Sequence, residues 1–151
     1  MAPAEAAEAD LGLDQAARRL IQERLTVLGY NTRGIDGIFG PGTRAAVSAW
    51  QGDQSLEASG FVTAEQLQLL AALAEARSAE LAAAAEQARQ EEEAADAAFW
   101  RTTGAGGSAS DLRAYLGRYP DGVYAAEARA ALERLDAAAA EEASAADREA
   151  W

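Results

Sequence analysis

The sequence predicts an all-α protein in which a small three-helix bundle is joined by a long helix to a helical hairpin. Three observations lead to this prediction. In residues 13–28, apolar residues recur at spacings of three and four, as on one face of a helix. Residues 64–98 contain no proline or glycine and are rich in alanine, leucine and glutamate. Clusters of glycine, proline and serine separate the remaining helical segments.

The first helix of the bundle is expected to end near Leu28. Its apolar stripe consists of Ala17, Leu20, Ile21, Leu25 and Leu28, and the arginines lie mostly off it. Gly29 follows directly and suits the position just past a helix end, where the backbone turns left-handed.

The second and third helices have their own start signals. Pro41 suits the first turn of a helix that places Ala46, Val47 and Trp50 on one face. Thr63 with Gln66 three residues later forms the pattern of a capping box, which begins the third helix.

The stretch "GIDGIFGPGT" at residues 34–43 could wrap a phosphate, wrap a metal or form a sharp turn between helices. A phosphate-binding loop needs a lysine, and a dinucleotide fingerprint needs a preceding strand; neither is present. A calcium loop needs several oxygen ligands, and here Asp36 stands alone. A turn remains, in which Asp36 supports the backbone, Phe39 fills the centre of the bundle and Gly40-Pro41-Gly42 redirect the chain.

The composition excludes most familiar chemistry. The chain has no cysteine, histidine or lysine, so thiolate and imidazole catalysis, Schiff bases and the usual zinc ligands are ruled out. We therefore expect no enzyme activity, no metal site and no cofactor. The net charge of −12 argues against nucleic acid, and no apolar run is long enough to enter a membrane. Residues 1–10 lack the features of a secretory signal, so we expect any export signal to lie upstream.

Residues 13–73 resemble the peptidoglycan-binding domain, a small three-helix module of bacterial cell-wall hydrolases and related envelope proteins. The elements that match its pattern in order are Gln22, Leu25, Gly29 and Tyr30, then Asp36, Gly37, Phe39, Gly40, Thr43, Ala46 and Val47, then Trp50 and Gln51, and finally Leu56, Gly60, Leu67 and Leu70. The sequence departs from the family where Trp50 replaces phenylalanine, Ser55 replaces glycine and Gln66 replaces threonine.

The resemblance implies a peptidoglycan stem peptide or glycan as the partner, held in a shallow groove. The residues expected to contact it are Tyr30, Asp36, Arg44, Trp50 and Gln51. Tyr30 and Trp50 could offer apolar faces to a sugar or peptide, and Arg44 could pair with a stem-peptide carboxylate. For each of them a role in the core or in a turn is the alternative.

The second half of the chain is interpreted as a tetratricopeptide-like αα-hairpin. Tyr115, Leu116 and Tyr119 are expected to face Tyr124, Ala128, Leu132 and Leu135 across the "YPDG" turn. Residues 99–135 are similar to helical units that follow caspase-like domains in some bacterial proteins. "AADAAFW" at residues 94–100 returns as "AADREAW" at residues 145–151, which suggests a repeat and a chain cut from a longer protein.

These inferences combine into one domain plan. We expect residues 1–10 to form a disordered tail, 11–74 the peptidoglycan-binding-like domain, 75–98 an alanine- and glutamate-rich connecting helix, 99–140 a helical hairpin repeat and 141–151 the start of a further, truncated repeat. The predicted function is non-catalytic binding of the cell wall by a module of a larger bacterial envelope protein, in the periplasm or cell envelope. The alternative is a protein–protein assembly segment in which this fold is a packing unit and the long helix self-associates.

Overall fold

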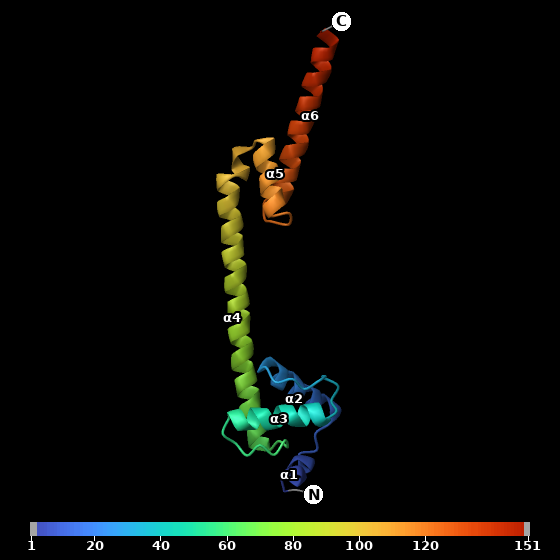
Figure 1. The fold of residues 1–151 in the computed structure, drawn as a ribbon, viewed down its shortest axis with the longest axis vertical. Helices are drawn as coiled ribbons and strands as arrows, with labels where there is room; N and C mark the ends of the chain where they lie inside the picture. Colours follow the sequence, from blue (N-terminus) through green and yellow to red (C-terminus); the bar gives the residue numbers. More distant parts are fainter. Residues whose placement is uncertain (1–2, 150–151) are drawn as a thin grey trace. The chain divides into compact units, whose positions relative to one another are not determined.

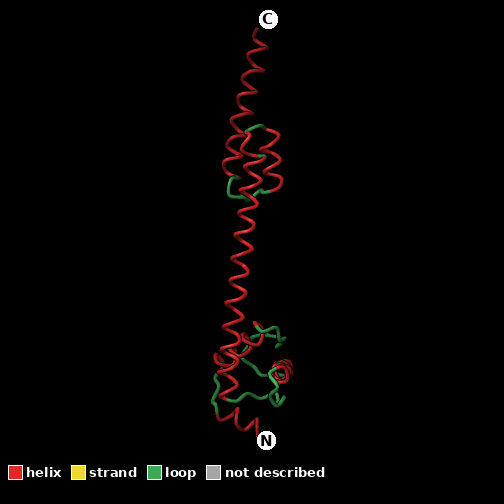
Figure 2. Tube along the Cα trace, turned by 90° about the vertical axis from the view of Figure 1, so that its left-hand side faces the viewer, coloured by secondary structure: helices red, strands yellow, loops and turns green. Residues whose placement is uncertain are grey.

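The computed structural model describes residues 3–149, and all regular structure within them is helical (Figure 1, Figure 2). The elements in chain order are α1 (Pro3–Asp10), α2 (Gln15–Val27), α3 (Pro41–Asp53), α4 (Ala64–Thr102), the short 3-10 helix η1 (Gly104–Gly106), α5 (Ala109–Arg118) and α6 (Ala125–Glu149). The predicted all-α class is thus confirmed for this part of the chain. The chain divides into two compact units, Met1–Ala83 and Ala84–Trp151, and α4 contributes residues to both.

Helix α2 ends where the sequence predicted. Gly29 takes a φ of +96°, its N–H donates to the carbonyl of Thr26, and the N–H of Tyr30 donates to the carbonyl of Leu25. These two bonds form a Schellman motif, which satisfies carbonyls that the helix itself leaves unpaired. The motif also sets the position of Tyr30 at the start of the next loop.

The starts of α3 and α4 also follow the sequence signals. Pro41 occupies the first turn of α3, after Gly40 as N-cap. At α4, the N–H of Gln66 donates to the hydroxyl of Thr63 at 3.2 Å, and the N–H of Thr63 donates to the side-chain oxygen of Gln66 at 3.3 Å. The predicted capping box is therefore present.

The core of the first unit lies between α2, α3 and the beginning of α4. Its buried side chains are Ile21, Leu25, Ala46, Val47, Trp50, Val62 and Leu70. Phe39 was expected to fill the centre of the bundle, but it packs half-buried against the edge of this core, with the guanidinium groups of Arg18 and Arg44 over its ring. Leu20 was expected on the apolar stripe, yet 43% of its surface is exposed. It lines a groove opposite Ala71 and Ala74 of α4, whose short side chains do not cover it.

The expected disordered tail over residues 1–10 differs from the structure, in which Pro3–Asp10 form helix α1. Glu8 is the buried residue of this helix, and its carboxylate pairs with Arg44 of α3. The partner lies 36 residues further along the chain, so no local sequence pattern reveals the contact. Residues 1–2 lie outside the described part of the chain.

In the second unit, α5 and α6 form the predicted hairpin, and the end of α4 packs with them. The buried residues are Leu112, Tyr115, Ala125 and Ala128, and the half-buried ones around them are Phe99, Trp100, Leu116, Tyr119, Tyr124, Ala131 and Leu132. Leu135 was expected to face α5, but it is 39% exposed. Helix α5 has only 10 residues, so α6 extends beyond it.

A buried carboxylate of α4 is bonded to α5 and to the turn that precedes α6. Asp96 of α4 accepts hydrogen bonds from the hydroxyl of Tyr115 at 2.5 Å and from the N–H of Val123 at 2.7 Å. The same hydroxyl accepts from the N–H of Tyr124 at 3.1 Å. A Cβ atom at Gly122 would lie 2.5 Å from that hydroxyl, so this turn requires glycine.

The predicted internal repeat stays a prediction. Its second copy ends at Trp151, which lies outside the described residues, and α6 continues as one helix through Glu149.

Candidate functional site

The glycine-rich loop of the first unit is held in place by one buried side chain of α2. The amide nitrogen of Gln22 donates to the hydroxyl of Thr43 at 3.0 Å, to the carbonyl of Ile38 at 3.1 Å and to the carboxylate of Asp36 at 3.2 Å. Its amide oxygen accepts from the N–H of Gly37 at 2.8 Å. The loop therefore has a defined shape because its backbone polar groups are paired with Gln22.

A second glutamine holds the loop before α4 in the same way. The amide nitrogen of Gln51 donates to the carbonyl of Phe61 at 2.8 Å and to the side chain of Gln66 at 2.9 Å, and its oxygen accepts from the N–H of Gly60 at 2.9 Å. Gln51 is fully buried. The sequence interpretation placed it among the ligand-contacting residues, but in the structure its hydrogen-bonding groups are used within the domain.

Trp50 is also fully buried, in the centre of the three-helix core. The sequence left two roles open for it, an apolar face toward a ligand or a place in the core, and the structure shows the core role because the stripe of α3 that carries Val47 points into the bundle. Its indole Nε1 is buried and has no hydrogen-bond partner among residues 3–149.

Tyr30 lies at the surface, half-buried against the core. Its hydroxyl donates to the carboxylate of Asp53 at 2.6 Å. This hydrogen bond, together with partial burial and the negative charge of Asp53, raises the pKa of Tyr30 to about 12. The phenol is therefore neutral at physiological pH, and the hydrogen bond fixes the orientation of the ring.

Tyr30 lines an open groove of about 540 Å³ between the end of α2 and the loop that follows it. The other lining residues are Thr26, Gly29, Asn31, Thr32, Gly34 and Ile35. Sequence reasoning missed Ile35, of which 44% is exposed. The sequence did contain a signal for an exposed apolar residue here, because Ile35 lies in a glycine-rich loop and outside any helical stripe that could bury it.

Asp36 is exposed and serves the turn. Its carboxylate accepts from the N–H of Ile38 at 2.9 Å, which is the side-chain-supported turn that the sequence predicted. Two hydrogen bonds hold the pKa of Asp36 below its usual range: the one from the N–H of Ile38 has the larger effect, and the one from the amide of Gln22 has the next. The carboxylate is therefore ionised at neutral pH, with one oxygen already engaged in the loop.

Arg44 is bound to neighbouring groups on several sides. Its guanidinium makes a two-bond pair with the carboxylate of Glu8, at 2.7 and 2.8 Å, and donates to the carbonyl of Gly60 at 3.0 Å. Its Cζ atom lies 4.1 Å from the ring centroid of Phe61 and 5.1 Å from that of Phe39. These contacts place a cation between aromatic faces, an arrangement that is favourable when the cation is partly shielded from water.

The five predicted site residues thus have different environments. Tyr30 lines the groove after α2, whereas Arg44 lines a second groove of about 260 Å³ beside α1. Asp36 lies in the loop between α2 and α3 with its carboxylate exposed to solvent. Trp50 and Gln51 are core residues, so only the first three retain surface that a ligand could reach.

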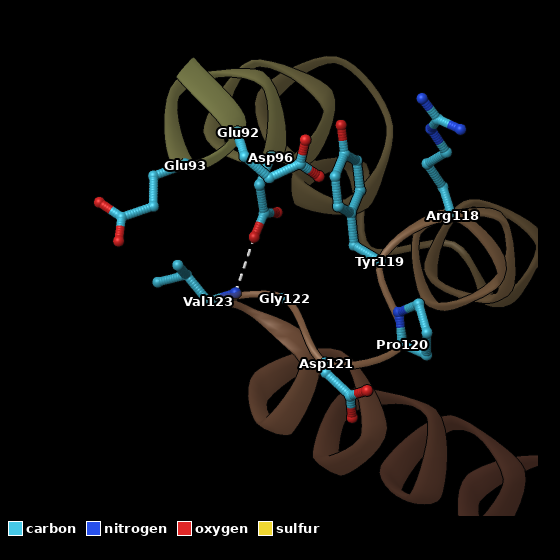
Figure 3. A pocket seen from close by; sticks show the side chains of 9 residues that line it. All are labelled: Glu92, Glu93, Asp96, Arg118, Tyr119, Pro120, Asp121, Gly122 and Val123. Atoms are coloured by element: carbon cyan, nitrogen blue, oxygen red, sulfur yellow. Dashed lines mark hydrogen bonds between the residues drawn. The ribbon is translucent and has the colours of Figure 1, made fainter. Parts of the chain in front are cut away.

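The second unit carries a groove of about 400 Å³ beside the "YPDG" turn (Figure 3). Its lining residues are Glu92, Glu93, Asp96, Arg118, Tyr119, Pro120, Asp121, Gly122 and Val123. Figure 3 shows the carboxylate of Asp96 bonded to the N–H of Val123. Since Asp96 also accepts from Tyr115, its role is to hold the turn against α4.

Residues 3–149 contain no group of three or more carboxylates placed to hold a metal ion. Over the same range, no helix combines the length and apolarity that crossing a membrane requires.

The order of loops and helices around Gln22 and Gln51 can be compared with known families. Residues 14–70 match the family model described as "Putative peptidoglycan binding domain". No curated protein and no solved structure matches the chain. The match confirms the predicted resemblance to a peptidoglycan-binding domain over residues 14–70 and supports a cell-wall partner for this segment.

The match ends at residue 70, before most of α4. The similarity of residues 99–135 to helical units that follow caspase-like domains therefore stays a prediction. Within the matched segment, the residues of the family pattern are mostly the ones that build the domain: Gln22, Gly37 and Thr43 hold the glycine-rich loop, and Leu25, Val47 and Leu70 form the core.

Proposed function

We propose that the first unit is a non-catalytic module that binds peptidoglycan through the groove lined by Tyr30 and Ile35, as part of a larger bacterial envelope protein. The observation that carries the proposal is this groove on the segment that matches a peptidoglycan-binding family. A tyrosine ring and an exposed isoleucine offer apolar surface to a sugar or peptide, and Asn31 and Thr32 supply polar groups beside it.

The groove is shallow and its walls are held from within. Tyr30 is oriented by Asp53, and the hydroxyl of Thr32 donates to the carbonyl of Gly34 at 2.8 Å. A site that is formed before the ligand arrives loses little ordering entropy on binding. We expect weak, reversible binding by one module, strengthened when the parent protein presents several contacts to the wall. Such a role corresponds to a location in the periplasm or cell envelope.

The direct test is sedimentation of the full chain with purified, insoluble peptidoglycan at low salt. We expect the chain in the pellet, and a chain that stays in the supernatant would show that wall binding is wrong.

Two isoleucines of one loop provide a matched pair for locating the site. Ile35 lines the groove, whereas Ile38 is more exposed, at 64%, and is not among the residues that line it. We expect Ile35→Ser to lower the bound fraction several-fold and Ile38→Ser to leave it unchanged. Equal loss in both variants would place the contact elsewhere on the domain.

A second candidate function is assembly through the long helix. Residues 75–95 of α4 are exposed along their whole length, including Leu81 at 47%. Self-association through this segment would give it a partner, as the sequence suggested. Sedimentation velocity over a concentration series tests this: a dimer that is lost in Leu81→Glu supports assembly, and a monomer at all concentrations excludes it.

A further inference from the structure

Helix α1 is attached to the first unit in an unusual way. It consists of one proline, alanines and acidic residues, with no large apolar side chain between Pro3 and Asp10. Surface helices normally pack through an apolar stripe. Here the buried residue is Glu8, of which 8% is exposed, so α1 is held by a carboxylate.

The groups that surround this carboxylate form a complete receptor for it. Both oxygens of Glu8 pair with the guanidinium of Arg44 in the parallel, two-bond geometry that arginine and carboxylates prefer. The backbone N–H of Val62 donates to the same carboxylate at 2.8 Å. Three hydrogen bonds therefore converge on one anionic group.

The receptor is held in place by groups other than Glu8. The carbonyl of Gly60 accepts from Arg44, and the rings of Phe61 and Phe39 lie against its guanidinium. The N–H of Val62 is fixed because the preceding loop is bonded to Gln51. The receptor is thus organised independently of α1, which is the condition for binding a separate ligand well.

We propose that Arg44 and the N–H of Val62 form a binding site for the carboxylate of a peptide ligand, and that Glu8 fills this site as an intramolecular substitute. The choice of a stem-peptide carboxylate as ligand rests on the proposed function. Helix α1 then acts as a plug, and a ligand must displace Glu8 to bind. Helix α1 itself carries no large apolar side chain, so its displacement sacrifices little apolar burial as long as Leu11, which packs against the core, stays in place.

The groove beside this site indicates where the rest of a ligand would lie. With α1 in place it has a volume of about 260 Å³ and is lined by Glu5, Glu8 and Ala9 of α1 and by Gly12, Leu13, Arg18, Arg44 and Phe61, and the last five remain when α1 is displaced. Arg18 provides a second cation, with its Cζ atom 5.9 Å from the ring centroid of Phe39. A ligand with one carboxylate on Arg44 could place a second anionic group near Arg18.

The plug sets the expected size of the effect. Glu8, as a tethered group, competes with a free ligand at an effective concentration in the millimolar range. The apparent affinity of the site for the ligand is then its intrinsic affinity multiplied by the fraction of time that Glu8 leaves the site free. If Glu8 occupies the site about nine-tenths of the time, removing its carboxylate should tighten ligand binding about tenfold.

The experiment is a titration of the full chain with N-acetyl-D-alanyl-D-alanine, followed by NMR shifts of the Val62 amide, with the C-terminal amide of the same dipeptide as the neutral probe. We expect Glu8→Ala to bind the free acid about tenfold more tightly than the unchanged chain, and the neutral probe to bind neither. Glu5→Ala is the matched control, because Glu5 lies on the same helix and lines the same groove, but is exposed. It should behave as the unchanged chain.

Two further variants test the receptor itself. In the Glu8→Ala background, Arg44→Gln should abolish binding of the free acid, and Arg44→Lys should weaken it because one ammonium cannot make the two-bond pair. Thermal unfolding by circular dichroism identifies any variant that fails to fold. If the Arg44→Gln variant fails to fold, the Arg44→Lys variant tests the receptor in its place.

Several outcomes would overturn the proposal. Unchanged affinity in Glu8→Ala, with or without a lower unfolding temperature, would make Glu8 only a structural tether. Equal binding of the two probes would remove the carboxylate from the argument. Sedimentation with insoluble peptidoglycan reports separately on wall binding through Ile35, so either idea can fail while the other stands.

Discussion

Replacing Ser55 by glycine should stabilise the first unit. Ser55 is the residue just past the end of α3, and its φ is +58°. Its N–H donates to the carbonyl of Gly52, and the N–H of Leu56 donates to the carbonyl of Gln51. This is the same Schellman motif that ends α2, where the corresponding residue is Gly29. The family pattern has glycine at this point, and the structure supplies the physical reason.

The size of the effect follows from the backbone conformation. A residue with a side chain costs about 1–2 kcal/mol in the left-handed region. Glycine removes this cost, but it loses about 0.4–1 kcal/mol more conformational entropy on folding. The side chain of Ser55 is exposed, so its removal sacrifices no core packing. The free energy of unfolding should therefore rise by about 1 kcal/mol, or by about 4–8 °C in the melting temperature of a unit of this size.

Urea unfolding measured by tryptophan fluorescence tests the prediction in the unit concerned. Trp100→Phe and Trp151→Phe leave Trp50 as the reporter, because the chain has three tryptophans. Ser55→Ala is the control, since it removes the hydroxyl and keeps the left-handed strain. If alanine stabilises as much as glycine, or glycine gives no gain, strain at this position is not the cause.

Three other perturbations have defined outcomes. Tyr115→Phe should cost about 2 kcal/mol in urea unfolding, since it removes a hydrogen bond to a buried carboxylate; a cost below about 0.5 kcal/mol would contradict this. Asp53→Asn should lower the pKa of Tyr30 from about 12 toward 10.0 in an absorbance titration. Folding raises that pKa, so the stabilisation from the Tyr30–Asp53 hydrogen bond is complete below pH 10 and is lost as the pH rises through about 12. The difference in free energy of unfolding between the unchanged chain and Asp53→Asn should therefore shrink between pH 10 and about 12. Gly37→Ala should cost more than about 2 kcal/mol, because φ is +80° and the new Cβ would lie 2.5 Å from a side chain of α2. Gly40→Ala has open space around it and should cost about 1 kcal/mol at most, from the poorer N-cap that alanine makes for α3.

The local elements of this protein were accessible from the sequence because each depends on neighbours along the chain. The end of α2 at Gly29, the first turn at Pro41 and the capping box of Thr63 each involve residues only a few positions apart. Backbone sterics and hydrogen bonds between near neighbours determine such features. The long helix α4 follows from the absence of any breaker between residues 64 and 98.

The candidate site could be predicted only in part. Tyr30 and the turn at Asp36 lie at the surface as expected, because the loop pattern specifies them locally. Trp50 and Gln51 were expected near a ligand, but both are buried. Whether residues of these types face the core or the solvent depends on how the three helices are rotated relative to one another. A large aromatic and an amide suit either place, so their chemistry alone does not decide it.

By itself, the sequence determined the all-α class, the end of α2, the starts of α3 and α4, the excluded chemistries and the resemblance to a wall-binding family, since these depend on residue types and short spacings. Only the tertiary structure decided which polar groups meet across the fold. It joined Gln22 to the glycine-rich loop 15 residues away, Asp96 to Val123 across 27 residues, and Glu8 to Arg44 across 36. Hydrogen bonds and ion pairs act over a few ångströms in space, and separation along the chain carries no record of them until packing brings the partners together.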